Sequence, residues 1–153
     1  MKGFHETTLG SVVTFQRGFD ITKNEQTPGH VQIISSSGPS STHDKYKVIG
    51  PGVIIGRKGT LGTVHYSENN FWPHDTTLWV KDFNGNNPRF IYYFLQTLKL
   101  ENFDTGSSNP TLNRNHIHKI KIIFPLRSRQ DKIAAILSAY DDLIENNKRR
   151  IAI

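Results

Sequence analysis

The 153-residue sequence contains no cysteine, which excludes a disulfide scaffold, thiol catalysis and a thiolate zinc site. No apolar run approaches the roughly 20 residues that span a membrane, and the polar start of the sequence lacks the apolar core of a secretory signal. With 35% hydrophobic and 21% charged residues, the composition is that of a globular domain and not of a disordered or fibrous chain. We therefore expect a cytoplasmic domain with its own core and no membrane partner.

Acidic residues are missing from two long segments of this basic chain. Nineteen Lys and Arg oppose thirteen Asp and Glu, which gives a net charge of +6. Residues 45–67 contain four basic residues and residues 114–130 contain five, without one acid, whereas acids gather at 82–104 and in the C-terminal segment. One part of the fold is thus suited to a polyanion and another to a protein, and the alternative is ordinary solvated charge.

The apolar pattern predicts an α+β fold: a β-rich, mixed or antiparallel domain with a few short helices, followed by a long C-terminal helix. Strands are expected at 31–34, 53–55, 63–66, 76–80 and 119–124, with the second and third forming a hairpin around a glycine-rich turn. Asn87 and Pro88 suit the N-cap and first position of a helix that ends at Leu98 and is apolar nearly all round, so we expect it to be buried. The serine-rich stretch 35–42 is expected to be an exposed loop.

The strongest periodic signal is a helix over residues 128–153, which follows a domain at 1–127. Ser128 and Asp131 have the spacing of a capping box. An apolar stripe recurs at helical spacing and faces away from the charged residues. The stripe consists of Ile133, Ile136, Leu137, Tyr140, Leu143, Ile144, Asn147 and Ile151. The helix either packs on its own domain or, since it is longer than such a domain needs, pairs with a partner as a truncated coiled coil in which Asn147 sets the register.

No motif for catalysis, metal binding or cofactor binding is complete. The segment 56–62 fails the G-x-x-x-x-G-K-[ST] spacing of a phosphate-binding loop, and we expect a tight turn that presents Arg57 or Lys58 outward. His74 and Asp75 lack further ligands at a metal-binding spacing, which favours a hydrogen-bonded pair that fixes its loop. The enzymatic alternative is a metal-dependent hydrolase that would use His65, His74, Asp75 and His116. The expectation is no catalytic residue, no metal and no cofactor.

The polar loops are rich in side chains that recognise DNA. Arg and Lys bind phosphates and guanine edges, whereas Asn, Gln, Ser and Thr hydrogen-bond to adenine and thymine edges. Such residues concentrate at 16–18, 35–42, 57–60 and 109–115. These segments predict a nucleic-acid-binding surface, with ordinary polar loops as the alternative.

Several short motifs occur along nearly the whole chain in an order that is typical of a known protein family. The motifs are TLG at 8–10, RGFD at 17–20, GPGVIIGRKGTLG at 50–62, FWPHDTTL at 71–78, PTLNRN at 110–115, then Pro125, Gln130 and a long helix with IAAIL at 133–137. Together they resemble the specificity (S) subunit of type I restriction–modification enzymes. The ordered set is far more specific than any one of its motifs.

The resemblance implies a function and a set of partners. Such subunits carry two target-recognition domains, each of which reads one half of a bipartite double-stranded DNA site through loops in the major groove. A long helix follows each domain; the two helices pack antiparallel as a spacer and bind methyltransferase (M) subunits. The M subunits methylate adenine with S-adenosylmethionine, a separate restriction subunit translocates and cuts DNA with ATP, and the S subunit has no catalytic role.

This chain has one recognition domain and one incomplete spacer helix. It is therefore expected to be either a fragment of a longer subunit or a half-subunit that pairs with itself, and the stripe that continues to Ile151 favours the fragment. Two further alternatives are the recognition domain of a fused restriction–methylation enzyme and a purely structural coiled-coil adaptor.

The candidate DNA contacts follow from polarity, charge and predicted loop position. They are Arg17, Lys23, Ser36, Ser37, Lys45, Arg57, Lys58, Thr60, His74, Asn109, Asn113 and Arg114. Because members of the family read different DNA sequences, the shared motifs are expected to shape the DNA-facing loops and not to determine which bases are read.

Overall fold

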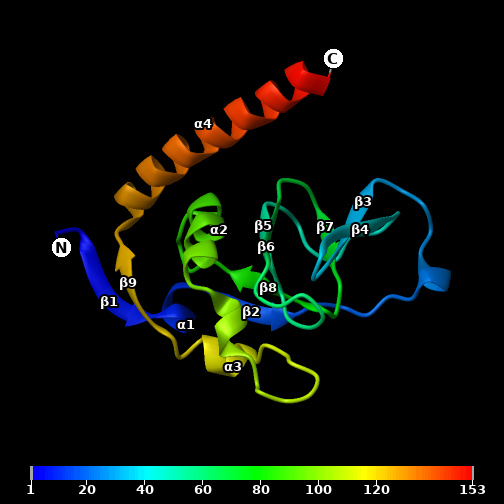
Figure 1. Cartoon of the computed structure of the whole chain (residues 1–153), viewed down its shortest axis with the longest axis horizontal. Helices are drawn as coiled ribbons and strands as arrows, with labels where there is room; N and C mark the ends of the chain where they lie inside the picture. The colour runs from blue at the N-terminus through cyan, green and yellow to red at the C-terminus, as the bar shows by residue number, and fades with distance from the viewer. Residues whose placement is uncertain (1, 153) are drawn as a thin grey trace.

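The computed structural model describes residues 2–152, whose strands form three small sheets (Figure 1). A two-stranded antiparallel ribbon pairs β1 (Phe4–Thr8) with β9 (Lys121–Pro125). An antiparallel sheet has the order β2 (Thr14–Arg17), β8 (Thr77–Asp82), β5 (Gly52–Gly56) and β6 (Val64–Ser67). The third sheet has the order β4 (Gly38–His43), β3 (Val31–Ser35) and β7 (Phe71–Pro73), with β3 and β7 parallel. The predicted α+β class with mixed and antiparallel pairing is confirmed.

Short helical segments connect the strands, and a long helix follows β9. The short segments are α1 (Leu9–Val12), the 3-10 turn η1 (Lys23–Glu25), α2 (Pro88–Thr97), the 3-10 turn η2 (Leu100–Phe103) and α3 (Arg114–Ile117). The long helix is α4 (Arg127–Ala152). Across residues 2–152, no helix has the length and apolar character needed to cross a membrane.

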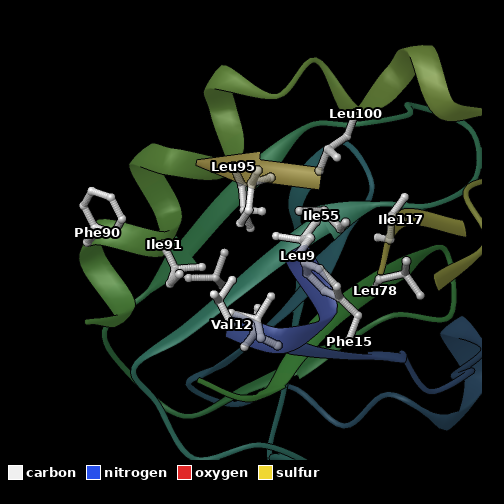
Figure 2. Packing of buried hydrophobic residues seen from close by; sticks show 14 of the residues in the cluster. Leu9, Val12, Phe15, Ile55, Leu78, Phe90, Ile91, Leu95, Leu100 and Ile117 are labelled. Atoms are coloured by element: carbon white, nitrogen blue, oxygen red, sulfur yellow. The ribbon is translucent and has the colours of Figure 1, made fainter. Parts of the chain in front are cut away.

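The apolar runs of β5 and β8 are continuous because both faces of their sheet are covered. Successive side chains of a strand point to opposite faces. Val53 and Ile55 of β5 join the larger core cluster, which also holds side chains from α1, α2 and β2 (Figure 2). Ile54 instead joins a smaller cluster with Phe71 and Trp79, between the four-stranded and three-stranded sheets. The smaller cluster holds the three-stranded sheet against the four-stranded sheet.

All five predicted strands are present as β3, β5, β6, β8 and β9. The glycine-rich hairpin is also confirmed, since the Gly56 N–H donates to the Thr63 carbonyl and the Gly62 N–H donates to the Gly56 carbonyl, both at 2.9 Å. A side chain at Gly56 would collide with the Thr60 carbonyl, which explains the glycine at the end of β5.

The prediction of a loop over 35–42 is wrong, because most of this stretch is the edge strand β4. After a tight turn at Ser36 and Ser37, the chain pairs with β3 in an antiparallel hairpin with one register shift. The backbone polar groups of an edge strand are paired on one side while its side chains stay in solvent, so serine and threonine fit there. Polar composition alone therefore did not distinguish this strand from a loop.

Helix α2 begins as predicted but is less buried than predicted. The Asn87 side chain accepts from the Phe90 N–H at 3.0 Å, and Pro88 occupies the first turn. Phe90, Ile91 and Leu95 are buried, whereas the other positions are half-buried or exposed. Arg89 and Tyr93 account for part of the difference, because their polar ends reach Glu68 and Asp141.

Helix α4 begins at Arg127, and the predicted capping box does not form. The Asp131 carboxylate accepts from Arg127 Nε at 2.7 Å and from Asn87 Nδ2 at 2.9 Å instead of turning back to Ser128. These two bonds lower the pKa of Asp131. Asp131 thus links α4 to the start of α2.

Gln130 anchors the first turn of α4 in the domain. Its side chain is 1% exposed. Its Oε1 accepts from the Asn87 N–H at 3.0 Å, while its Nε2 donates to Asn86 Oδ1 at 2.9 Å and to the Pro125 carbonyl at 3.0 Å. One amide therefore joins β9, α4 and the segment before α2.

A second attachment lies further along α4, around Arg89 of α2. The Arg89 guanidinium stacks on the Tyr66 ring at 4.5 Å and forms ion pairs with Glu68 at 3.4 Å and Asp141 at 3.5 Å. The Tyr93 hydroxyl donates a short hydrogen bond to the same Asp141 carboxylate. These contacts tie β6, α2 and α4 together.

Most of the predicted apolar stripe of α4 is exposed, so the helix does not pack along its length on its own domain (Figure 1). Ile133 is half-buried against the core. The exposed members are Ile136, Leu137, Tyr140, Leu143, Ile144, Asn147 and Ile151.

We expect the free energy of unfolding to fall in mild acid because of His118. Its Nε2 accepts from the Phe15 N–H at 3.0 Å, which requires the neutral ring, and its ring stacks on Phe15. Burial, followed by the charge of Arg114, lowers the pKa of His118 below its usual 6.5. Because the unfolded chain binds the proton more readily, His118 contributes its full stability above about pH 6.5 and loses it as the pH falls toward the lowered pKa.

Urea unfolding at pH 7.5 and pH 5.5 measures this effect. We expect the wild type to lose more stability over this interval than His118→Gln, which keeps an acceptor but does not titrate. Equal losses in the two proteins would contradict the assignment.

Candidate nucleic-acid interface

The turn at 56–62 is held against the loop at 74–77 by Arg57. Its backbone N–H donates to the Thr76 carbonyl at 2.8 Å. Its Nε and a terminal nitrogen donate to the Asp75 carbonyl at 3.0 and 2.6 Å. Burial, followed by the charge of Arg17, lowers the pKa of Arg57. Of the two residues expected to point outward, Lys58 is exposed and Arg57 is half-buried.

Ser36 supports the same loops from the β3–β4 turn. Its side chain is buried. Its N–H donates to Thr76 Oγ1 at 3.2 Å, and its carbonyl accepts from Thr63 Oγ1 at 2.5 Å. Its hydroxyl accepts from the Thr60 N–H at 3.4 Å. Ser36 is thus a support for Thr60 and the glycine-rich turn.

His74 and Asp75 lie together in the loop at 74–77, where His74 Nδ1 accepts from the Thr76 N–H at 3.3 Å. His74 Nδ1 lies 3.1 Å from an Asp75 oxygen, and its Nε2 lies 3.8 Å from Asp20. The Arg17 guanidinium pairs with the other Asp75 oxygen at 3.3 Å. The Gly18 N–H donates to the Thr77 carbonyl at 3.0 Å, so the end of β2 is attached to this loop.

The residues proposed for a hydrolase do not form one metal site. Within the part of the chain that the structure describes, the group able to hold a cation is Asp20, His74 and Asp75, without His65 or His116. His65 lies instead 3.2 Å from the Ser36 carbonyl. A cation at Asp75 would face Arg17, which already neutralises that carboxylate.

A second part of the surface brings Lys58 next to the 104–113 segment. Lys58 forms a β-bridge with Thr111, and the Leu112 N–H donates to the Arg57 carbonyl at 2.9 Å. Lys58 and Asn109 line the same shallow cavity of about 290 Å³. The two candidates from distant segments therefore lie together.

The remaining candidates occupy three kinds of position. Lys23 and His74 line an open groove beside the β3–β4 hairpin. Asn113 caps α3, since its Oδ1 accepts from the Asn115 N–H at 2.8 Å, and Arg114 is exposed on the same turn. The exposed residues Ser37 and Lys45 lie at the hairpin turn and in the segment after β4.

Sequence reasoning missed a cation held over two aromatic rings. The Lys47 ammonium lies 5.3 Å from the Phe19 ring centre and 5.0 Å from that of Trp72. Trp72 is itself fixed, because its Nε1 donates to the Phe19 carbonyl at 3.0 Å. Lys47 and Arg17 line the same open cavity. The signal available in the sequence was the position of Lys47 in the acid-free segment 45–67.

The resulting surface is rigid, polar and rich in cations. Four separate segments hydrogen-bond to one another, and Arg17 and Lys58 reach solvent from them. Lys47 lines a cavity with Arg17, and Lys23 lines a groove with His74. Such a surface suits contacts to phosphates and base edges better than it suits an enclosed small-molecule site.

Comparison with known families agrees with a nucleic-acid-binding surface. A family model described as "Type I restriction modification DNA specificity domain" matches residues 1–153. The chain belongs to this family, which confirms the resemblance seen in the sequence.

Relatives and solved structures are similar over only part of their own length. The chain is 26% identical over 102 residues to the type I restriction enzyme MjaIX specificity subunit of Methanocaldococcus jannaschii, covering 64% of this chain and 24% of that protein. It is 30% identical over 95 residues to the EcoprrI specificity subunit of Escherichia coli, covering 61% of this chain and 24% of that protein. The chain thus spans about a quarter of the length of these relatives.

Two crystal structures share the fold. The S subunit of the type I system from M. genitalium superposes with a TM-score of 0.80 at 22% identity, covering 94% of this chain and 40% of that one. The HsdS subunit from Thermoanaerobacter tengcongensis gives 0.69 at 13% identity, covering 97% and 40%.

Proposed function

We propose that this chain recognises a short sequence in double-stranded DNA and reads one half of a bipartite target without catalysis of its own. The observation that carries the proposal is the match to a DNA specificity domain over residues 1–153. The rigid cationic surface formed by separate loops supports it, because cations position a protein on phosphates while polar loop side chains read bases. The catalytic steps of methylation and cleavage would then belong to other subunits.

The proposed protein partners are methyltransferase subunits, through them a restriction subunit, and a second recognition domain or a second copy of this chain. The support is the exposed apolar stripe of α4, which runs beyond the contacts with the domain. An exposed stripe of this kind is typical of an interaction surface.

Selection from random duplex DNA tests the proposed function. The chain is incubated with a random duplex pool at near-physiological salt, alone and together with a methyltransferase subunit of the same system. We expect enrichment of a motif of a few base pairs in at least one of the two settings. No enriched motif in either setting, with the partner bound normally, would contradict sequence recognition.

The salt dependence of binding tests Lys58. A lysine that contacts a phosphate releases about one counterion, so Lys58→Ala is expected to reduce the slope of log K against log salt by about 1. Lys132→Ala removes the same charge from the exposed surface of α4 and is expected to leave the slope unchanged. Equal slopes for the wild type and Lys58→Ala would remove Lys58 from the contact surface.

A further inference from the structure

The β3–β4 hairpin presents an uncovered polar strand at one end of the molecule. β4 is the edge of its sheet, and its residues 39–42 are exposed one after another. Residues 31–43 contain no acid, and six of the eight residues at 35–42 carry hydroxyl groups. In Figure 1 the hairpin and the blue turn of η1 lie at the right, opposite β1 and β9. A two-stranded ribbon is narrow enough to enter the DNA major groove, which is about 12 Å wide.

A groove of about 610 Å³ separates this hairpin from the segment 21–28. Ser41 and Thr42 line it from β4, and Lys23 and Gln26 line it from the opposite segment. The exposed ring of Pro28 adds apolar surface to the groove. The groove therefore offers hydroxyls, an amide, a cation and an apolar patch, which are the groups that recognise base edges and the thymine methyl.

The polar side chains around the groove are of two kinds: some form hydrogen bonds within the hairpin, and others form none. The hydroxyl of Ser35 donates to the Gly38 carbonyl at 3.1 Å, and that of Ser40 donates to the Ile33 carbonyl at 3.2 Å, so both stabilise the hairpin. By contrast, the side chains of Ser41, Thr42 and Gln26 take part in none of the hydrogen bonds found between residues 2 and 152. Their donors and acceptors are available to a ligand.

The two walls of the groove are fixed relative to each other. The Thr27 N–H donates to His43 Nδ1 at 3.0 Å, which ties the segment 21–28 to the end of β4. The Glu25 carboxylate accepts from the Thr22 N–H at 2.7 Å and from the Thr22 hydroxyl at 2.9 Å. This acid is thereby committed to closing η1, and a DNA strand would meet a preformed groove.

We propose that Gln26, Ser41 and Thr42 read base edges in the major groove of duplex DNA. The β3–β4 hairpin would enter this groove between the two sugar–phosphate backbones. The Lys23 ammonium binds a phosphate at the rim. This inference rests on the proposed DNA recognition and assigns its sequence-reading side chains. The Gln26 amide, with one donor and one acceptor face, matches the N6 and N7 positions of adenine.

The test compares half-site selection and affinity for the wild type, Gln26→Ala, Thr42→Val and Lys23→Ala. Gln26→Ala and Thr42→Val are each expected to lose preference at one or two base pairs and to bind the wild-type half-site on the order of 10-fold more weakly, with unchanged affinity for unrelated duplex. Lys23→Ala is expected to weaken binding to all duplexes alike and to reduce the salt slope by about 1.

Gln96→Ala and Thr97→Val, which alter exposed residues of α2, are the matched controls and are expected to select the wild-type motif with wild-type affinity. If the wild type enriches a motif and Gln26→Ala and Thr42→Val enrich the same motif with the same affinity, the assignment of these side chains is wrong while DNA recognition stands. If the wild type enriches no motif alone or with its partner, both proposals are wrong.

Discussion

Replacing Gln130 by leucine is expected to lower the free energy of unfolding by about 3 kcal/mol, because buried polar partners lose their hydrogen bonds while the volume of the side chain hardly changes. In the wild type, this 1% exposed amide accepts from the Asn87 N–H and donates to the Pro125 carbonyl and to Asn86. Leucine can replace none of these bonds. The buried Pro125 carbonyl would remain desolvated and unpaired, at a cost of about 1–3 kcal/mol, and the half-buried Asn87 N–H would also lose its partner.

Urea titration followed by circular dichroism measures this change. Gln96→Leu is the matched control, since Gln96 lies on the exposed surface of α2 and its amide donates only to the Tyr92 carbonyl of its own helix. We expect that variant to stay within about 0.5 kcal/mol of the wild type. A similarly small change for Gln130→Leu would show that the Gln130 network does not stabilise the attachment of α4.

Phe124→Ala is expected to destabilise the fold by about 4 kcal/mol. The Phe124 ring is 1% exposed. Its centre lies 5.6 Å from that of Phe90 and 5.1 Å from that of Phe94, both in edge-to-face geometry. Truncation would leave a cavity between α2 and the β1–β9 ribbon, whose attachment to the domain depends on this side of β9. The loss therefore combines transfer free energy, aromatic contacts and a cavity that a strand and a helix cannot easily close.

Ile123→Ala provides the comparison, because neighbouring residues of a strand face opposite sides. Ile123 is 59% exposed. Its truncation is expected to cost less than about 1 kcal/mol, mainly through lower strand propensity. Unfolding free energies that fall equally in the two variants would mean that the core does not extend under β9 as described.

Local signals in the sequence were sufficient for the central strands, for the N-cap of α2 and for the family. β5 and β8 each contain a continuous apolar run, and Asn87 followed by Pro88 is a strong helix start. β4 was missed because its side chains are polar, and its strand character comes from pairing with β3. That pairing is a tertiary property of the hairpin and leaves no apolar alternation in the sequence.

The sequence identified the loop segments of the candidate site better than it identified the roles of their individual side chains. The motifs correctly marked the loops that meet, but polarity and charge did not reveal which side chains hold those loops together. Arg57 and Ser36 have the residue types of DNA contacts, yet their hydrogen bonds go to Asp75, Thr60 and Thr63. Lys47 was recognisable only as one more basic residue, because its placement depends on the rings of Phe19 and Trp72 from distant segments.

The two attachments of α4 have a geometric consequence. A helix attached to its domain at one point can rotate about that point, whereas a helix attached at two points has a fixed direction. Gln130 and Asp141 fasten α4 at positions about 16 Å apart along its axis, at 1.5 Å per residue. The outer turns after Asp141 therefore keep a fixed direction relative to α2 and β6. A partner bound to those turns would therefore meet the domain at a set angle, which the Arg89 contacts with Asp141 keep constant.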